Sequence, residues 1–194
     1  MKIILASQSP RRRDILQTVG VRFDICPADV DETVDPSLSP DEAVKEISRR
    51  KAKKVFEEHK DEDVLVIAAD TVVSINGEIL GKPKDEKDAH RMLSMLSDAP
   101  NYVYTGYTLM THGKTYTDAE CTAVYFRALD EKDIARYIAT GEPFDKAGGY
   151  GIQEKGDLFV RRIEGDYFNV VGLPVCALYE AARRELGVDI CDPS

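Results

Sequence analysis

Apolar residues form continuous runs in some stretches of the chain and recur at helical spacing in others. The alternation of these two kinds of stretch predicts an α/β fold. Residues 3–6 and 64–69 are continuously apolar, as is typical of strands buried on both faces of a sheet. Between residues 40 and 59 the apolar positions instead recur at helical spacing. The rest of the pattern predicts strands at 21–26, 102–110, 115–126, 158–163 and 167–171, and helices at 85–96, 130–141 and 174–186.

A hairpin is predicted shortly after the second apolar run. Residues 72–75 and 78–80 have strand patterns, and the Asn76-Gly77 pair between them is a strong signal for a two-residue turn. Such a turn nearly fixes the pairing register of its two strands. We therefore expect Lys82 to return close to the level of Thr71 and Asp70.

Asp70 is predicted to stand at the end of the second apolar run. A carboxylate at the end of a central strand lies where open α/β sheets bind their ligands. The structural alternative is an aspartate that caps a local turn. The position favours the functional interpretation.

Basic residues crowd the start of the first predicted helix. Ser9 suits the N-cap and Pro10 suits the first helical position. Residues 11–13 are all arginine, and they stand in the first turn, where the helix dipole is already positive. Either this helix end binds a strong anion, for which phosphate is the usual guest, or it is a solvated basic turn.

Lys51 lies on the apolar face of the helix that Ser39 is predicted to cap. It falls in the middle of the stripe formed by Val44, Ile47 and Val55. Its ammonium group either snorkels along this face to water or reaches into a cleft that holds an anion. Snorkelling is the commoner outcome for such a lysine.

A glycine-rich segment occupies residues 141–153, with four glycines among its first eleven residues. Glycine at this density indicates unusual backbone conformations or close approach of the backbone to another group. The segment matches neither the dinucleotide-binding nor the Walker-type glycine pattern. It forms either a wall around a ligand or an irregular connection.

Composition narrows the class of function. The 194 residues predict a single domain spanning 1–194, and the formal net charge of −9 argues against a general nucleic-acid binder. The four cysteines form no C-x-x-C pair, and the chain has neither a signal-peptide pattern nor an 18-residue apolar run, which predicts a cytoplasmic protein with reduced thiols and no membrane association. The three histidines are too scattered for a metal site or a Ser-His triad.

Five separated motifs together resemble the Maf family of nucleoside triphosphate pyrophosphatases. Each motif is weak alone, but all five occur in order, with family-like spacing, over nearly the whole chain. The motifs occupy Leu5–Arg12, Ala69–Val72, Gly81–Pro83, Asp145–Gln153 and Val171–Pro174.

The resemblance implies an inosine-triphosphatase-like fold, with a twisted mixed sheet flanked by helices and two lobes about a central cleft. It implies hydrolysis of a nucleoside triphosphate between the α and β phosphates, assisted by a divalent cation, Mg²⁺ or Mn²⁺. Asp70 matches the proton acceptor, and Glu32, together with Asp70, is implied near the metal. The residues implied to hold the triphosphate are Ser7, Arg12, Lys51 and Lys82.

The resemblance also indicates which base the substrate carries. Arg11, Thr71 and Gln153 match the subgroup that acts on dTTP and UTP, whereas the subgroup that acts on 7-methyl-GTP tends to have Trp, Gln and Glu at those positions. A homodimer is implied as well. The alternative is a nucleotide-binding regulator of septum formation in which catalysis is not essential.

Overall fold

The computed structural model describes residues 1–192, which form helices and the strands of one mixed sheet. The strands are β1 (Lys2–Leu5), β2 (Asp24–Ile25), β3 (Val64–Ile75), β4 (Glu78–Leu80), β5 (Pro100–Met110), β6 (Thr115–Phe126) and β7 (Val160–Glu164). The α-helices are α1 (Pro10–Thr18), α2 (Pro40–Glu58), α3 (Glu86–Leu96), α4 (Glu131–Ile138), α5 (Tyr167–Val171) and α6 (Val175–Ala181). Short 3-10 turns are η1 (Glu142–Asp145), η2 (Ala147–Gly149) and η3 (Lys155–Phe159), and a π-helical turn, η4 (Ala182–Leu186), continues α6.

The sheet has the strand order β2-β1-β3-β5-β6-β7, and β4 pairs with β3. β1 runs parallel to both β2 and β3, whereas β4 is antiparallel to β3 and β7 is antiparallel to β6. The α/β class and the mixed, helix-flanked sheet that the sequence predicted are therefore confirmed.

The chain divides into two compact units. The first comprises residues 1–70, 105–120 and the chain from Gly172 on, and the second comprises 71–104 and 121–171. β3, β5 and β6 each contribute residues to both units.

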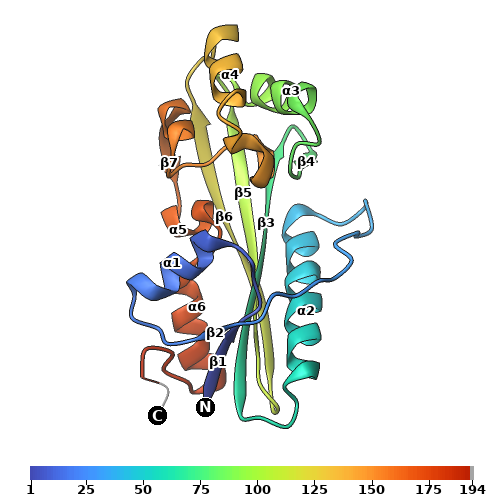
Figure 1. Ribbon diagram of the computed structural model, residues 1–194, viewed down its shortest axis with the longest axis vertical. Helices are drawn as coiled ribbons and strands as arrows, with labels where there is room; N and C mark the ends of the chain where they lie inside the picture. The colour runs from blue at the N-terminus through green and yellow to red at the C-terminus, as the bar shows by residue number, and fades with distance from the viewer. Residues whose placement is uncertain (193–194) are drawn as a thin grey trace. The chain divides into compact units, whose positions relative to one another are not determined.

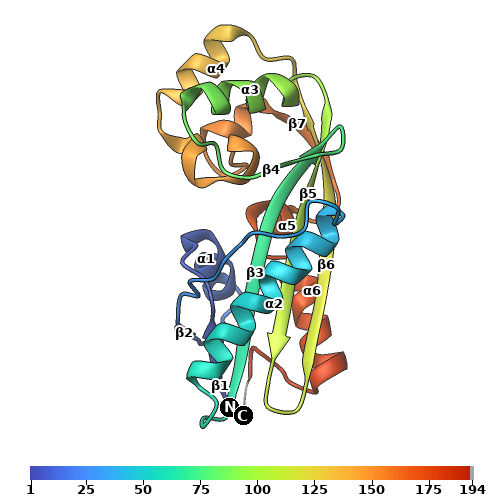
Figure 2. The same cartoon turned by 90° about the vertical axis from the view of Figure 1, so that its right-hand side faces the viewer.

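In the first unit, α2 packs on one face of β1 and β3 (Figures 1 and 2). Side chains alternate between the two faces of a strand. The even-numbered residues Val64, Val66 and Ala68 of β3 pack in one cluster with Ala52 and Val55 of α2. The same alternation turns the side chain of residue 70 toward α2, which is how a buried strand comes to present a carboxylate to a helix.

In the second unit, α3 and α4 lie side by side (Figures 1 and 2). The apolar face predicted for α3 is buried in one cluster with Val73 and Ile75 of β3 and an aromatic group that includes Phe126, Tyr150 and Phe159. The hairpin forms as predicted: Asn76 and Gly77 have φ of 52° and 79°, and Ile75 pairs with Glu78.

β3 differs from the prediction in its length. The sequence predicted a strand that ends at Asp70-Thr71 and a second strand that begins at Val72. Aspartate is generally depleted in strands. The structure has one continuous strand, Val64–Ile75, with Asp70 in its interior. The carboxylate is tolerated there because it is paired with Lys51 at 2.7 Å.

Two predicted strands were also wrong in type or extent. Residues 167–171 form α5 rather than a strand: Gly165 has a φ of 127°, and the Asp166 carboxylate accepts the Phe168 amide hydrogen at 2.8 Å, which starts a helical turn. The strand expected at 21–26 is reduced to β2, because only Ile4 and Leu5 of β1 find partners in it.

Candidate active site

The loop between β1 and α1 places Ser7 beside Arg12. Ser9 caps α1, and its side chain accepts the Arg12 amide hydrogen, as predicted. One helical turn later the Arg12 side chain therefore points back at the loop, where its Nη1 donates to Ser7 Oγ at 3.2 Å. Ser7 is only 8% exposed, so the hydroxyl and the guanidinium are held in one fixed arrangement.

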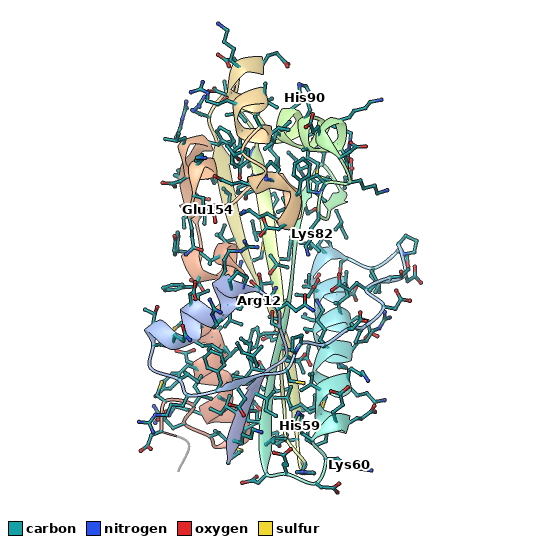
Figure 3. All side chains as sticks on the ribbon, viewed as in Figure 1. Arg12, His59, Lys60, Lys82, His90 and Glu154 are labelled. Carbon is teal, nitrogen blue, oxygen red and sulfur yellow. The ribbon has the colours of Figure 1, made fainter. Side chains whose placement is uncertain are left out.

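Arg12, which Figure 3 labels, also forms a hydrogen bond with a residue 160 positions later in the chain. Its Nε donates to the carbonyl oxygen of Gly172 at 2.7 Å, and Gly172 has a φ of 120° that favours glycine. Burial lowers the pKa of the Arg12 guanidinium, Asp70 and Glu32 oppose that shift, and Arg11 adds to it. A guanidinium remains charged through such a shift, so Arg12 brings a partly desolvated positive charge to this end of α1.

Lys51 joins two carboxylates. Its Nζ lies 2.7 Å from Asp70 Oδ1 and 2.7 Å from Glu32 Oε1. The side chains of Lys51 and Asp70 are 11% and 12% exposed, whereas Glu32 is 59% exposed. Lys51 therefore does not snorkel to water, and the structure brings together three residues that the resemblance placed in the site.

These contacts follow from the packing of α2 on β3. Ala52 and Val55 of α2 fix the helix against the even-numbered face of the strand, and Lys51 on the same helical face reaches Asp70. Removing one partner of such a buried pair typically costs about 3–5 kcal/mol, because the other charge is left without compensation. The pair thus couples the position of the candidate base to the position of α2.

The Glu32–Asp70 pair fits a divalent cation by its donor chemistry. Both carboxylates converge on one cationic atom, and hard oxygen donors are the ligands that Mg²⁺ prefers. Over residues 1–192, no group of three or more His, Cys, Asp or Glu side chains could hold a metal ion. Mg²⁺ commonly uses only one or two carboxylates and takes its other ligands from waters and substrate phosphates.

Lys82 belongs to the second unit and is exposed. The β3–β4 pairing stops at Val73 and Leu80, two residues before Lys82 reaches Thr71. The strand after the turn then meets the glycine-rich segment: the Gly81 carbonyl oxygen accepts the Gly148 amide hydrogen at 2.9 Å. The structure therefore joins two motifs that are 67 positions apart (148 − 81) in the sequence.

Gln153 lies at the end of the glycine-rich segment, is exposed, and belongs to the second unit with Thr71. The segment contains two 3-10 turns, η1 and η2, and its role as a wall around a ligand stays a prediction. A Cβ at Gly148 would lie 2.9 Å from the Val73 side chain, and its φ of 68° also favours glycine. Gly148 is thus explained by close packing on β3.

Two residues of the site region were not among the candidates from the sequence. Gly172 supplies the carbonyl that holds Arg12, and Lys146 is a lysine only 6% exposed inside the glycine-rich segment. Both stand in motifs that carry the resemblance, but neither has a charge or spacing pattern that indicates a contact so distant in the chain.

No helix within residues 1–192 is both long and apolar enough to span a bilayer.

Comparison with known proteins places these motifs in a family. The family model for Maf-like protein matches residues 2–185. The dTTP/UTP pyrophosphatase of Carboxydothermus hydrogenoformans is 50% identical over 186 residues, covering 95% of this chain and 98% of that protein. The dTTP/UTP pyrophosphatase of Alkaliphilus oremlandii is 47% identical and covers 97% of this chain and 98% of its own.

Among solved structures, the Staphylococcus aureus Ham1 protein is 15% identical and superposes with a TM-score of 0.43, covering 65% of this chain and 72% of its own. That likeness is too slight to bear on function. The family model and the two sequence relatives each span almost the whole chain, so this chain belongs to the Maf family.

Proposed function

We propose that this protein hydrolyses dTTP and UTP, each to its nucleoside monophosphate and inorganic diphosphate (pyrophosphate). The observation that carries the proposal is the contact of Lys51 with Asp70 and Glu32, beside the basic end of α1. A carboxylate, an ammonium and a guanidinium in one unit are the parts that attack at a phosphoryl group requires. The two relatives of about 50% identity that carry the name dTTP/UTP pyrophosphatase support the same substrates.

In this proposal, Asp70 accepts the proton of the attacking water. A positioned base typically contributes about 10²–10⁴ in rate. Ser7 and Arg12 hold phosphate oxygens, and each charge-assisted hydrogen bond is worth about 1.5–3 kcal/mol. Lys51 exchanges part of its contact with the carboxylates for a phosphate oxygen, and Lys82 provides a further positive charge to the triphosphate.

Glu32 and Asp70 would hold the divalent cation that the family uses. When bound, such a cation neutralises phosphate charge and lowers the pKa of a water that it binds. With two carboxylates as its only protein ligands, we expect tight binding only in the presence of the nucleotide.

Arg11, Thr71 and Gln153 are proposed to select the base. Gln153 can both donate and accept through its amide, as thymine and uracil require at their hydrogen-bonding edge. We also propose that the protein acts on free nucleotides in the cytoplasm and that it forms a homodimer, which light scattering on the 21.6 kDa chain would test.

The test is hydrolysis of a panel of triphosphates with Mg²⁺ or Mn²⁺, scored by release of monophosphate and diphosphate. We expect dTTP and UTP to be the best substrates, and Asp70→Asn to remove at least about 10²-fold of the rate while the circular dichroism spectrum stays unchanged. Better hydrolysis of 7-methyl-GTP would overturn the assignment of Arg11, Thr71 and Gln153. Full activity of the variant would overturn Asp70 as the base.

The alternative function is a nucleotide-binding regulator of septum formation that does not depend on catalysis. Such a regulator needs positive charges for the phosphates but no carboxylate aimed at a water. If wild-type protein binds dTTP and releases no diphosphate with either metal, this alternative replaces the enzyme.

A further inference from the structure

Lys146 is a buried lysine with acceptors on three sides. Its Nζ lies 2.8 Å from Asp145 Oδ1, 3.1 Å from Glu154 Oε2 and 2.9 Å from the carbonyl oxygen of Glu142. Its side chain is 7% exposed, whereas those of Asp145 and Glu154 are 60% and 46% exposed. An ammonium group donates three hydrogen bonds; the glycine-rich segment provides two of the acceptors, at Glu142 and Asp145, and Glu154, the residue after the segment, provides the third.

The segment is folded around the stem of this lysine. A Cβ added at Gly151 would lie 2.6 Å from Lys146 Cε and 2.8 Å from its Cδ. The chain therefore crosses the lysine closely at Gly151, and a side chain there would have to displace the Lys146 stem. The Gly151 amide hydrogen is in turn accepted by the hydroxyl of Tyr137 at 3.2 Å.

Contacts of the same segment hold the chain immediately after Gln153. Glu154, the next residue, is paired with Lys146 (Figure 3 labels Glu154). Lys155 follows, and its amide donates to Glu142 Oε2 at 3.2 Å. Gln153 itself is exposed, so the position of its side chain depends on how firmly Glu154 and Lys155 hold the chain that follows it.

We propose that Lys146, acting through Glu154, is a positioning residue that fixes Gln153 and thereby sets the discrimination between bases. The inference rests on the proposed function, in which Gln153 contacts the base. A site that hydrogen-bonds its substrate discriminates strongly only while its groups are held in register. Loss of the Lys146–Glu154 pair keeps the glutamine at position 153 but no longer holds its side chain in one position.

Glu154→Gln tests the pair, and Asp145→Asn is its matched control. Each variant removes one carboxylate charge from the same ammonium group, but only Glu154 is adjacent to Gln153. The measurement is kcat/KM for dTTP and for CTP, whose base presents a different hydrogen-bonding edge. We expect Glu154→Gln to lower the dTTP-to-CTP ratio about tenfold, mainly through a higher KM for dTTP, and Asp145→Asn to leave it within about twofold.

Lys146→Met separates positioning from folding, because it keeps the stem that packs on Gly151. We expect the same change of ratio, a lower Tm, and no further change of ratio when Glu154→Gln is added, since coupled residues are not additive. The proposal fails if Glu154→Gln and Asp145→Asn shift the ratio equally, or if either Lys146→Met or Glu154→Gln leaves it unchanged.

Gln153→Ala distinguishes this failure from failure of the base assignment. If Gln153→Ala collapses the ratio and Glu154→Gln does not, Gln153 reads the base without help from Lys146. If Gln153→Ala also leaves the ratio unchanged, the assignment of Gln153 itself is wrong.

Discussion

Lys51 occupies the point toward which Glu32 and Asp70 converge, 2.7 Å from each. One ammonium group thus offsets part of the negative charge of the two carboxylates that we propose for the divalent cation. A cation that binds there must compete with Lys51, whereas a triphosphate offers Lys51 another partner. Nucleotide and metal are therefore expected to strengthen each other's binding, a coupling that linkage makes reciprocal.

Lys51→Met should tighten the binding of Mn²⁺ to the nucleotide-free protein. The variant removes the positive charge that lies 2.7 Å from both carboxylates. A unit charge this close, at an effective dielectric of about 20, is enough to change the affinity for Mn²⁺ about tenfold or more. Electron paramagnetic resonance titration of Mn²⁺ measures this directly.

Lys45→Met is the control for that titration, because Lys45 is on the same helix but pairs with Asp41 at 3.2 Å. Unchanged or weaker Mn²⁺ binding by Lys51→Met would show that Glu32 and Asp70 do not share the cation. Circular dichroism of both variants checks that the fold is retained.

At the scale of the elements, α2 is held by β5 as well as by β3. A Cβ at Gly106 of β5 would lie 2.4 Å from the carbonyl carbon of Val44 and 2.7 Å from the amide nitrogen of Lys45. The strand backbone therefore passes directly against the helix backbone. Because α2 carries Lys51, this close contact fixes the helix that fixes the candidate base.

Gly106→Ala should destabilise the protein and lower its activity together. The added methyl group meets backbone atoms that cannot rotate away, and overpacking of this kind typically costs about 1–3 kcal/mol or more. Gly113→Ala is the control, since a Cβ there has nothing within 4 Å. Thermal unfolding and kcat/KM measure the two effects, and an unchanged Tm for Gly106→Ala would contradict the close approach.

At the scale of the whole chain, the two compact units share their strands. β3 continues from Val64 to Ile75 through the boundary at residue 70, and β5 and β6 also contribute to both units. If one unit unfolds, these strands lose their partners there, and the halves that remain in the other unit are held less firmly. The units are therefore not expected to unfold as independent domains.

Thermal unfolding should thus give one cooperative transition. Far-ultraviolet circular dichroism and tyrosine fluorescence, which the absence of tryptophan leaves unobscured, should report the same midpoint. Two separated transitions would show that the shared strands do not couple the units.

Features that depend on a few neighbouring residues were determined by the sequence alone. The cap at Ser9, the turn at Asn76-Gly77 and the apolar face of α3 have their physical causes within one or two turns of chain, and all three formed as predicted. The prediction of a strand at 167–171 was wrong, and its cause is also local. The strand pattern there is short, and the hydrogen bond from the Phe168 amide to the Asp166 carboxylate favours a helical turn.

Only the tertiary structure decided the partners of the buried charges. Lys51 meets Asp70 because α2 packs on the even-numbered face of β3, and Arg12 meets the carbonyl of Gly172, 160 positions away. Hydrophobic spacing indicates that a residue is buried but not what lies opposite it, since that depends on strand order and on which face each strand turns to its helix. The sequence therefore named Arg12, Lys51 and Asp70 as candidates, whose roles stay a prediction, and the order of the sheet decided which side chains touch.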